Sequence, residues 1–402
     1  MAELNAARMH RVPTLIRVAV IYLAARLVTT LMLALAAQLS GSASRFGADA
    51  TVGSFVLGWD AQWYWLIALD GYPTDLPRTD SGEVAENSWA FMPVYAYLAR
   101  GLGSLLGSWG LAALFISLLA GFGAAVMLYF LLRERIGVTA ATWAVAFFSC
   151  APLAAMFQVG YAESLFLLLL FTALWLVVKR RYAWLLVLIP VMGYTRPGIL
   201  AFALFLGLHG IWRWYRRRDE PLPVRQIILI IASGLLATAV GFSWQVIAAV
   251  VTGEPSAYLS TELAWRRNWL PAAADNFVPF DGFIQASGFW FARWGLPALV
   301  GPVVLVLLVA GFFAALLWWQ RVRVIGVDLR LWCASYLIYL LAVFFPQSSV
   351  FRLLVPLSPL WGAFAAPRSL IWRLVTLLGC LLGQWVWIEN MYAQANTFWQ
   401  IP

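Results

Sequence analysis

The residues best suited to chemistry are a few carboxylates and arginines beside apolar segments. Asp60 follows Trp59 in the stretch GWDAQWYWLIALDGY (58–72), which is rich in Trp and Tyr. An aspartate held at the edge of an apolar segment can take the proton from an incoming hydroxyl, as a general base does. Asp60 could instead cap a helix, because Asp accepts hydrogen bonds from the free N–H groups of a first turn.

Four arginines are candidates for binding an anionic phosphate. Arg196 and Arg352 are the first choice, and the pair Arg266–Arg267 in AWRRNWLP is the second. Guanidinium groups bind phosphate oxygens with two parallel hydrogen bonds and stabilise negative charge that develops on a leaving group. The alternative is that these side chains reach lipid headgroups and have no catalytic role.

Two further acids border apolar, aromatic segments. Glu163 follows Tyr161, and the pair could bind the hydroxyl groups of an acceptor; Glu163 could equally favour the N-terminus of a helix. Glu86 could bind a sugar, or hold Mg²⁺ or Mn²⁺ together with Asp60. We expect no metal and no other cofactor.

Tryptophans are candidates for stacking on sugar rings. Trp59 and Trp63 flank Asp60, while Trp89 and Trp269 lie in the same and in a later polar segment. Most of the 23 tryptophans are expected to anchor the chain at the membrane–water interface instead.

The composition places these residues in an all-α polytopic membrane protein. The chain has 402 residues, of which 63% are apolar and 11% charged, and its mean hydropathy is +0.82. Soluble domains carry about 25% charged residues. The net charge of +9 lies in short basic clusters between apolar runs, which indicates membrane topology and excludes a nucleic-acid-binding face. The two histidines and three cysteines are not spaced as ligands of zinc, haem or an iron–sulfur cluster.

Apolar runs predict about eleven transmembrane helices, within a range of ten to thirteen, in a single domain covering 1–402. The first seventeen residues are expected in the cytoplasm and to be followed by a retained span, the alternative being a cleaved signal peptide. The predicted spans are 18–39, 110–132, 138–157, 162–178, 182–194, 198–212, 226–251, 296–319, 331–345, 353–366 and 370–387.

This layout puts two long loops, 40–93 and 252–295, and most of the acids on the outer face of the membrane. Most of the basic residues fall on the inner face, as the positive-inside rule requires. Residues 59–72 are predicted to form an interfacial helix, with Trp59, Trp63 and Asp70 on one face, and Pro93 to start the helix that re-enters the membrane. Function is therefore sought in the first outer loop.

Several short motifs follow one another along the chain: Trp59-Asp60-Ala61, Gly71-Tyr72, Ala90-Phe91-Met92-Pro93, Pro152, Tyr161-Ala162-Glu163-Ser164-Leu165-Phe166, Thr195-Arg196-Pro197-Gly198 and Arg352. In this order they resemble the PIG-V family, mannosyltransferases of the GT-C superfamily. The similarity is detailed over about 15–215; Gln62-Trp63-Tyr64 matches only loosely, and the 252–295 loop does not align.

The resemblance implies a glycosyltransferase with Asp60 as the base and Arg196 and Arg352 at the donor phosphate. Its donor would be polyprenyl-phosphate-mannose, and its acceptor a glycolipid or lipid-linked glycan on the extracytoplasmic side of a bacterial-type cell membrane. Inversion at the sugar would give an α-mannoside, α-1,6-linked by family resemblance.

Two other classes of protein remain as alternatives. A transporter or flippase for a lipid-linked or anionic solute would place charges deep within its spans. Here the centres of the spans are nearly free of charge, with Arg26 as the main exception. A non-catalytic scaffold subunit would have no need for Asp60 and Arg196 at positions that match the family.

Overall fold

The computed structural model describes residues 13–267, 277–397 and 400–402, and these residues fold into helices. Within the described residues the extended pairing is an isolated bridge between Arg78 and Val84. In chain order the α-helices are α2 (Thr14–Leu39), α3 (Val52–Val56), α4 (Asp60–Asp70), α5 (Pro93–Leu106), α6 (Trp109–Ser149), α7 (Glu163–Val178), α8 (Leu185–Gly193), α9 (Ile199–Tyr215), α10 (Val224–Thr252), α11 (Ala257–Arg267), α12 (Asp281–Arg293), α13 (Val300–Trp318), α14 (Gln320–Arg323), α15 (Val327–Val343), α16 (Val350–Leu353), α17 (Trp361–Ala365) and α18 (Leu370–Ile388). Short 3₁₀ segments are η1 (Ser88–Ala90), η2 (Ala154–Gln158), η3 (Tyr182–Trp184) and η5 (Val355–Leu360), and η6 (Glu389–Gln394) is π-helical.

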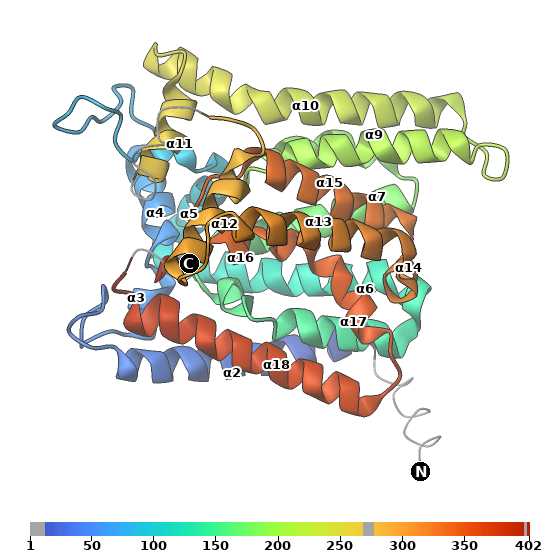
Figure 1. Cartoon of the computed structure of the whole chain (residues 1–402), viewed down its shortest axis with the longest axis horizontal. Coiled ribbons are helices and arrows are strands. Elements are labelled where there is room, and N and C mark those ends of the chain that lie inside the picture. Colours follow the sequence, from blue (N-terminus) through green and yellow to red (C-terminus); the bar gives the residue numbers. More distant parts are fainter. Residues whose placement is uncertain (1–12, 268–276, 398–399) are drawn as a thin grey trace.

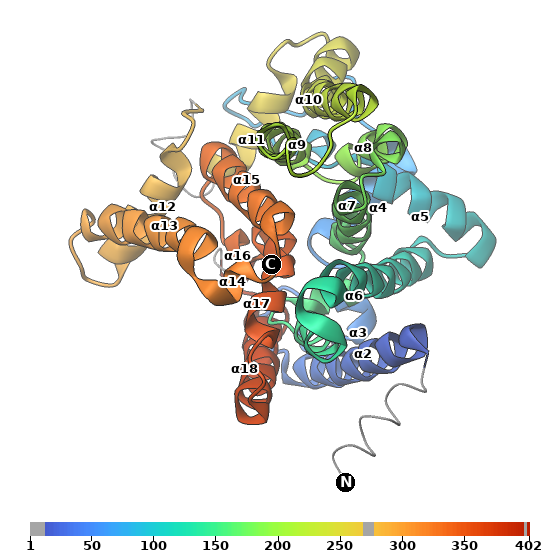
Figure 2. The same cartoon turned by 90° about the vertical axis from the view of Figure 1, so that its right-hand side faces the viewer.

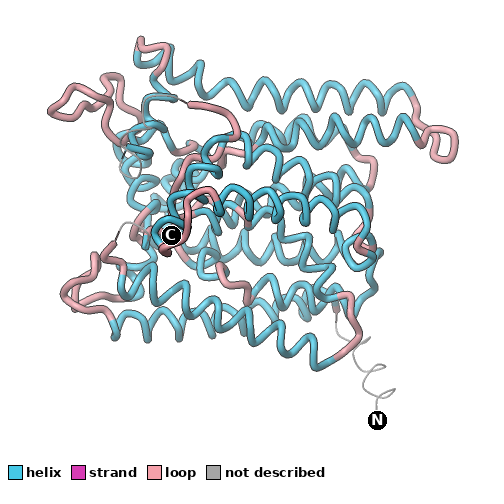
Figure 3. Tube along the Cα trace, in the orientation of Figure 1, coloured by secondary structure: helices cyan, strands magenta, loops and turns pink. Residues whose placement is uncertain are grey.

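The long helices lie side by side in one bundle, and short helices gather at one end of it. In Figure 1, α2, α6, α9, α10 and α18 run across the view, while α3, α4, α5 and α11 lie at the left. Figure 2 shows the bundle along its helices, and Figure 3 shows that the loops collect at the two ends. The two segments predicted as outer loops thus contribute their short helices to the same end of the molecule.

The protein is an integral membrane protein by the character of its surface. Five of the described helices are long and apolar enough to cross a bilayer: α2, α6, α10, α13 and α18 with η6. On α13 the side chains of Val306, Leu307 and Leu308 are about two-thirds exposed, at 65%, 66% and 67%. Water does not tolerate such a continuous apolar surface, whereas lipid tails do. The predicted total of eleven spans stays a prediction, since several of the other apolar helices are shorter.

Three of the predicted spans differ in detail from the structure. The span 110–132 and most of 138–157 form the two arms of α6, which ends at Ser149 and kinks at Gly137, where φ is 80°. Glycine has no Cβ and adopts this left-handed conformation readily. The predicted span 353–366 is not one regular helix but η5 and α17, because Pro356 and Pro359 lack the N–H groups that an α-helix needs.

The helix predicted over 59–72 is confirmed as α4, and Pro93 is confirmed as the first residue of α5. The position of α4 at a membrane interface stays a prediction. The buried residues of α4 are Ala61, Tyr64, Ile67 and Ala68, whereas Asp70 is exposed. The small Ala side chains let α4 pack closely on α5 and the first arm of α6.

A buried hydrogen-bonded chain joins α9 and α15 away from these short helices. His209 Nδ1 lies 2.9 Å from Asp328 Oδ1, and His209 Nε2 lies 3.0 Å from the Tyr182 hydroxyl. Buried polar groups are stable in an apolar interior when they have such partners. His209 therefore has a structural role in the packing of these helices.

Candidate active site

The start of α4 has an unusual backbone. Trp59, the residue before the helix, has φ 54° and ψ −125°, in a region that bulky residues rarely adopt. Its side chain is held in place, since the indole N–H donates to the Met391 carbonyl at 3.0 Å and the Arg45 guanidinium lies 4.5 Å above the ring. Strain of about 1–3 kcal/mol persists where surrounding contacts fix a residue, and such residues cluster at functional sites.

Asp60 is the first residue of α4, and its carboxylate points to another part of the chain. Its Oδ2 accepts a hydrogen bond from Arg352 Nη1 at 2.6 Å. Both side chains are largely shielded, with 19% of the Asp60 side chain and 10% of the Arg352 side chain exposed. Among the described hydrogen bonds this contact replaces the capping role that the sequence left open for Asp60.

Two more charged residues extend the pair into a chain of alternating charge. Arg352 Nε lies 3.4 Å from Glu163 Oε1, and Arg196 Nη2 lies 3.3 Å from the same oxygen. The cluster of Asp60, Arg352, Glu163 and Arg196 therefore holds two carboxylates and two guanidinium groups. Buried charges are tolerated when they are paired in this way.

Turns at helix ends bring the four residues together. Glu163 is the first residue of α7, and Tyr161 just before it lies under Arg352, whose guanidinium carbon is 5.5 Å from the ring centroid. Arg196 lies in the turn between α8 and α9, which begins after Gly198, with φ 134°. A residue with a Cβ would be strained at Gly198, and Pro197 prevents a continuous helix there.

Burial controls the ionisation of the cluster. Burial raises the pKa of Asp60 above its ordinary value, Arg352 opposes this rise, and the negative charge of Glu163 adds to it. Burial opposes the charge on Arg352, but Asp60 and Glu163 outweigh that effect and raise the pKa of Arg352. Arg352 therefore stays cationic, while Asp60 is a stronger base than an exposed aspartate.

Part of the hydrogen-bonding capacity of Arg352 remains unused. Its Nε is buried and has no hydrogen-bond partner among the described residues, although the Glu163 carboxylate lies near. A guanidinium group has five N–H donors and suits the oxygens of a phosphate.

The described contacts of Arg267 and Trp63 lie outside this four-residue cluster. Arg267 contacts Glu83 at 3.4 Å and the Val84 carbonyl, so it fastens α11 to the 73–88 segment. The Arg266 side chain and Trp269 fall outside the described residues. Glu86 is half-buried in the same segment. Trp63, one turn after Asp60, stacks on Phe91 at 5.8 Å and meets Trp265 edge-on at 5.4 Å.

The structure adds residues that the sequence did not single out. Glu262 on α11 is half-buried beside Tyr258, and desolvation raises the pKa of Glu262 to about 7. Glu262 precedes Trp265 by one helical turn, so the two side chains lie on the same face of α11. This spacing is the feature of the sequence that could have identified Glu262 as a candidate. No described group of three or more His, Cys, Asp or Glu residues is placed to hold a metal ion.

Comparisons with known proteins leave the family open. No protein-family model matches the chain, and no curated protein matches it. Among solved structures it is similar to an Archaeoglobus fulgidus oligosaccharyltransferase in complex with zinc and sulfate, with 13% identity and a TM-score of 0.40. The match covers 92% of this chain and 53% of that one, so this chain spans about half the length of the matched structure.

Proposed function

We propose that this protein is an integral-membrane glycosyltransferase of the GT-C type. It transfers mannose from polyprenyl-phosphate-mannose to a glycolipid or lipid-linked glycan at the extracytoplasmic face. The observation that carries this proposal is the ion-pair chain Asp60–Arg352–Glu163–Arg196, in which a buried carboxylate lies beside two phosphate-binding cations. The PIG-V resemblance supports the choice of mannose.

The reaction is a direct displacement with Asp60 as general base. The acceptor hydroxyl gives its proton to the Asp60 carboxylate while its oxygen bonds to the anomeric carbon. The bond between that carbon and the phosphate oxygen breaks, and its electron pair leaves with the polyprenyl phosphate. A direct displacement inverts the anomeric centre, so a β-linked donor gives an α-mannoside, which the family resemblance makes α-1,6-linked.

The charges around Arg352 balance during this step. Before transfer Arg352 pairs with ionised Asp60 at 2.6 Å, and the donor phosphate carries one negative charge. When Asp60 takes the proton it becomes neutral, and the leaving phosphate gains the negative charge. Arg352 can then pair with the phosphate in place of Asp60, which stabilises the product side of the reaction.

The raised pKa of Asp60 suits this role. A base accepts a proton more readily as its pKa approaches the working pH. Burial is the main cause of the rise, and Arg352 keeps enough of Asp60 ionised for it to act as a base. Glu163 forms ion pairs with both Arg196 and Arg352 and so fixes their positions relative to each other. The Tyr161 ring packs against the Arg352 guanidinium.

The charged residue within a predicted span, Arg26, gives little support to the alternative that the protein is a transporter. Arg26 on α2 is buried, but its guanidinium donates to the carbonyls of Ser149 and Ala154 and to the Gln158 side chain. Through these hydrogen bonds Arg26 connects α2 to the end of α6 and to η2. It is therefore a packing residue in this structure, whereas a transporter would need it to face a solute path.

The test is a donor screen with purified protein in liposomes that contain a lipid extract as acceptor source. Radiolabelled polyprenyl phosphates of mannose, glucose, galactose and arabinose are offered separately, with GDP-mannose as the soluble control. We expect a labelled lipid product from the mannose donor, with an α-linkage. Transfer from GDP-mannose alone, or a β-linked product, would overturn the donor class or the displacement mechanism.

A further inference from the structure

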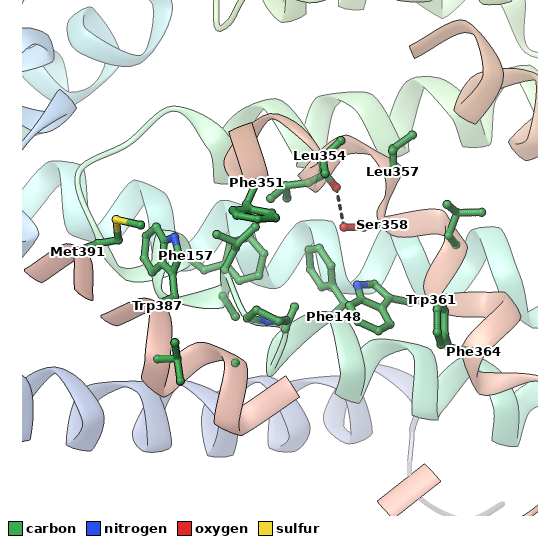
Figure 4. A pocket seen from close by; sticks show the side chains of 18 of the residues that line it. Phe148, Phe157, Phe351, Leu354, Leu357, Ser358, Trp361, Phe364, Trp387 and Met391 are labelled. Carbon is green, nitrogen blue, oxygen red and sulfur yellow. Dashed lines mark hydrogen bonds between the residues drawn. The ribbon is translucent and has the colours of Figure 1, made fainter. Parts of the chain in front are cut away.

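A large apolar cavity lies next to the ion-pair cluster. Its volume is about 660 Å³, within the range of about 300–1,000 Å³ that is typical of ligand pockets. It lies between the end of α6, the α16–η5–α17 segment and α18. Figure 4 shows that aromatic and aliphatic side chains line it, among them Phe148, Phe157, Leu357, Trp361 and Trp387.

The few polar side chains in the lining already have partners. The Ser358 hydroxyl donates to the Val355 carbonyl at 2.6 Å, and the Asn390 amide donates to the Val386 carbonyl at 2.8 Å. Gln400 accepts from the backbone N–H groups of Asn396 and Thr397. The cavity therefore favours a hydrocarbon ligand over a polar one.

Two residues that line the cavity are linked directly to residues at the cluster. Phe351 lines it and directly precedes Arg352 in the chain. Met391 also lines it, and its carbonyl accepts the hydrogen bond from Trp59, the neighbour of Asp60. In Figure 4 Met391 and Phe364 lie at opposite ends of the labelled side chains that line the cavity.

We propose that this cavity binds the hydrocarbon tail of the lipid-phosphate donor, with the phosphate at Arg352. The inference rests on the proposed function and specifies where its donor lies. A ligand with a phosphate at Arg352 and a long apolar tail would fill both the charged end and the apolar cavity. A water-soluble sugar nucleotide could use the charged end alone.

A narrower cavity should discriminate between donors of different tail length. Leu357→Trp on η5 and Ala151→Phe after α6 enlarge side chains that line the cavity. With a long polyprenyl donor, we expect kcat/KM to fall by about 10-fold or more in both variants, since loss of apolar contacts in a pocket has effects of this size. With a short-chain prenyl donor, kcat/KM should stay within about twofold of the wild type.

A second cavity provides a matched control. It has a volume of about 300 Å³, and Ala315 lines it without lining the first cavity. Ala315→Trp should therefore leave kcat/KM unchanged for donors of both lengths. Equal losses with long and short donors in the two test variants, or the same long-donor loss in Ala315→Trp, would overturn the proposal.

Photo-crosslinking separates failure of this proposal from failure of the proposed function, because it needs no turnover. A polyprenyl phosphate with a diazirine at the far end of its tail is irradiated with wild-type protein in liposomes, and labelled peptides are identified by mass spectrometry. We expect labels within 357–364, at the end of the cavity away from Met391, competed by unlabelled polyprenyl phosphate. Labels elsewhere, or equal competition by an ordinary phospholipid, would contradict a donor-tail site even if sugar transfer is observed.

Discussion

Arg352 Nη1 lies 2.6 Å from Asp60 Oδ2, joining residues 292 positions apart in the chain. The same guanidinium lies 3.4 Å from Glu163, so one cation contacts two carboxylates. This arrangement holds the proposed base ionised and places a phosphate-binding group directly beside it. It also makes the stability and the activity of the protein depend on the same contact.

Arg352→Gln should lower both activity and stability. Breaking one partner of a buried ion pair costs about 3–5 kcal/mol. Since Arg352 lowers the pKa of Asp60, its loss raises that pKa further. A carboxyl whose folded pKa is raised loses stability as the pH rises through that pKa, so the loss should be larger near about pH 8 than near about pH 5.

Thermal unfolding of the detergent-solubilised protein at the two pH values measures this effect. Arg267→Gln is the control, because the contact of Arg267 with Glu83 lies outside the cluster. A stability loss in Arg352→Gln that is independent of pH, or equal to that of Arg267→Gln, would contradict the electrostatic account.

Glu163→Gln should shift the pH profile of transfer. The negative charge of Glu163 raises the pKa of Asp60, so its removal lowers that pKa. Because the base must be ionised, the acid limb of kcat/KM should move to lower pH. Glu83→Gln keeps the cluster intact and should leave the limb in place. An upward shift in Glu163→Gln would show that the two carboxylates are not coupled in this sense.

Trp59→Phe tests whether the strained turn positions Asp60. The substitution keeps an aromatic ring and removes the hydrogen bond to the Met391 carbonyl, at a cost of about 1 kcal/mol in stability. We expect kcat to fall several-fold with little change in KM for the donor. Trp65, which is 45% exposed on the same helix, gives the control Trp65→Phe. Equal kinetics in the two variants would remove the positioning role of Trp59.

Glu262→Gln should change the pH dependence of stability. Burial raises the pKa of Glu262 from 4.5 to about 7, so the wild type loses stability as the pH rises through this window. The uncharged amide does not titrate. As the pH rises through this window, the free energy of unfolding of the variant should therefore increase by on the order of 3 kcal/mol relative to the wild type. The measurement is the unfolding midpoint of wild type and variant at pH values below and above this window. Curves of midpoint against pH that run parallel for the two proteins would contradict the raised pKa of Glu262.

The local elements of the site could be predicted from the sequence. A tryptophan-rich stretch after a span gave the helix α4, and Pro93 gave the start of α5, because both depend on neighbouring residues alone. Asp60, Glu163, Arg196 and Arg352 could be named as candidates from their types and their positions beside apolar segments. The resemblance to the PIG-V family pointed to the same four residues.

The contacts between these elements could not be predicted from one sequence. Which oxygen Arg352 contacts depends on how α4, α7 and α16 pack, and no local pattern encodes that packing. The predicted span 353–366 was wrong as a regular helix, although Pro356 and Pro359 were visible, because its overall hydropathy dominated the prediction. The segment of η5 and α17 lines the large cavity. The hydrophobic pattern of a regular helix over 353–366 does not predict such a cavity.

The most direct test of the proposed mechanism compares wild type with Asp60→Asn. Both proteins are reconstituted in liposomes and supplied with radiolabelled polyprenyl-phosphate-mannose and acceptor lipids, with unfolding midpoints measured on the same samples. The proposal predicts transfer by the wild type and a loss of about 10²–10⁴-fold in the folded variant, the usual contribution of a general base. Full activity of Asp60→Asn, or no transfer by the wild type from any polyprenyl-linked sugar, would contradict it.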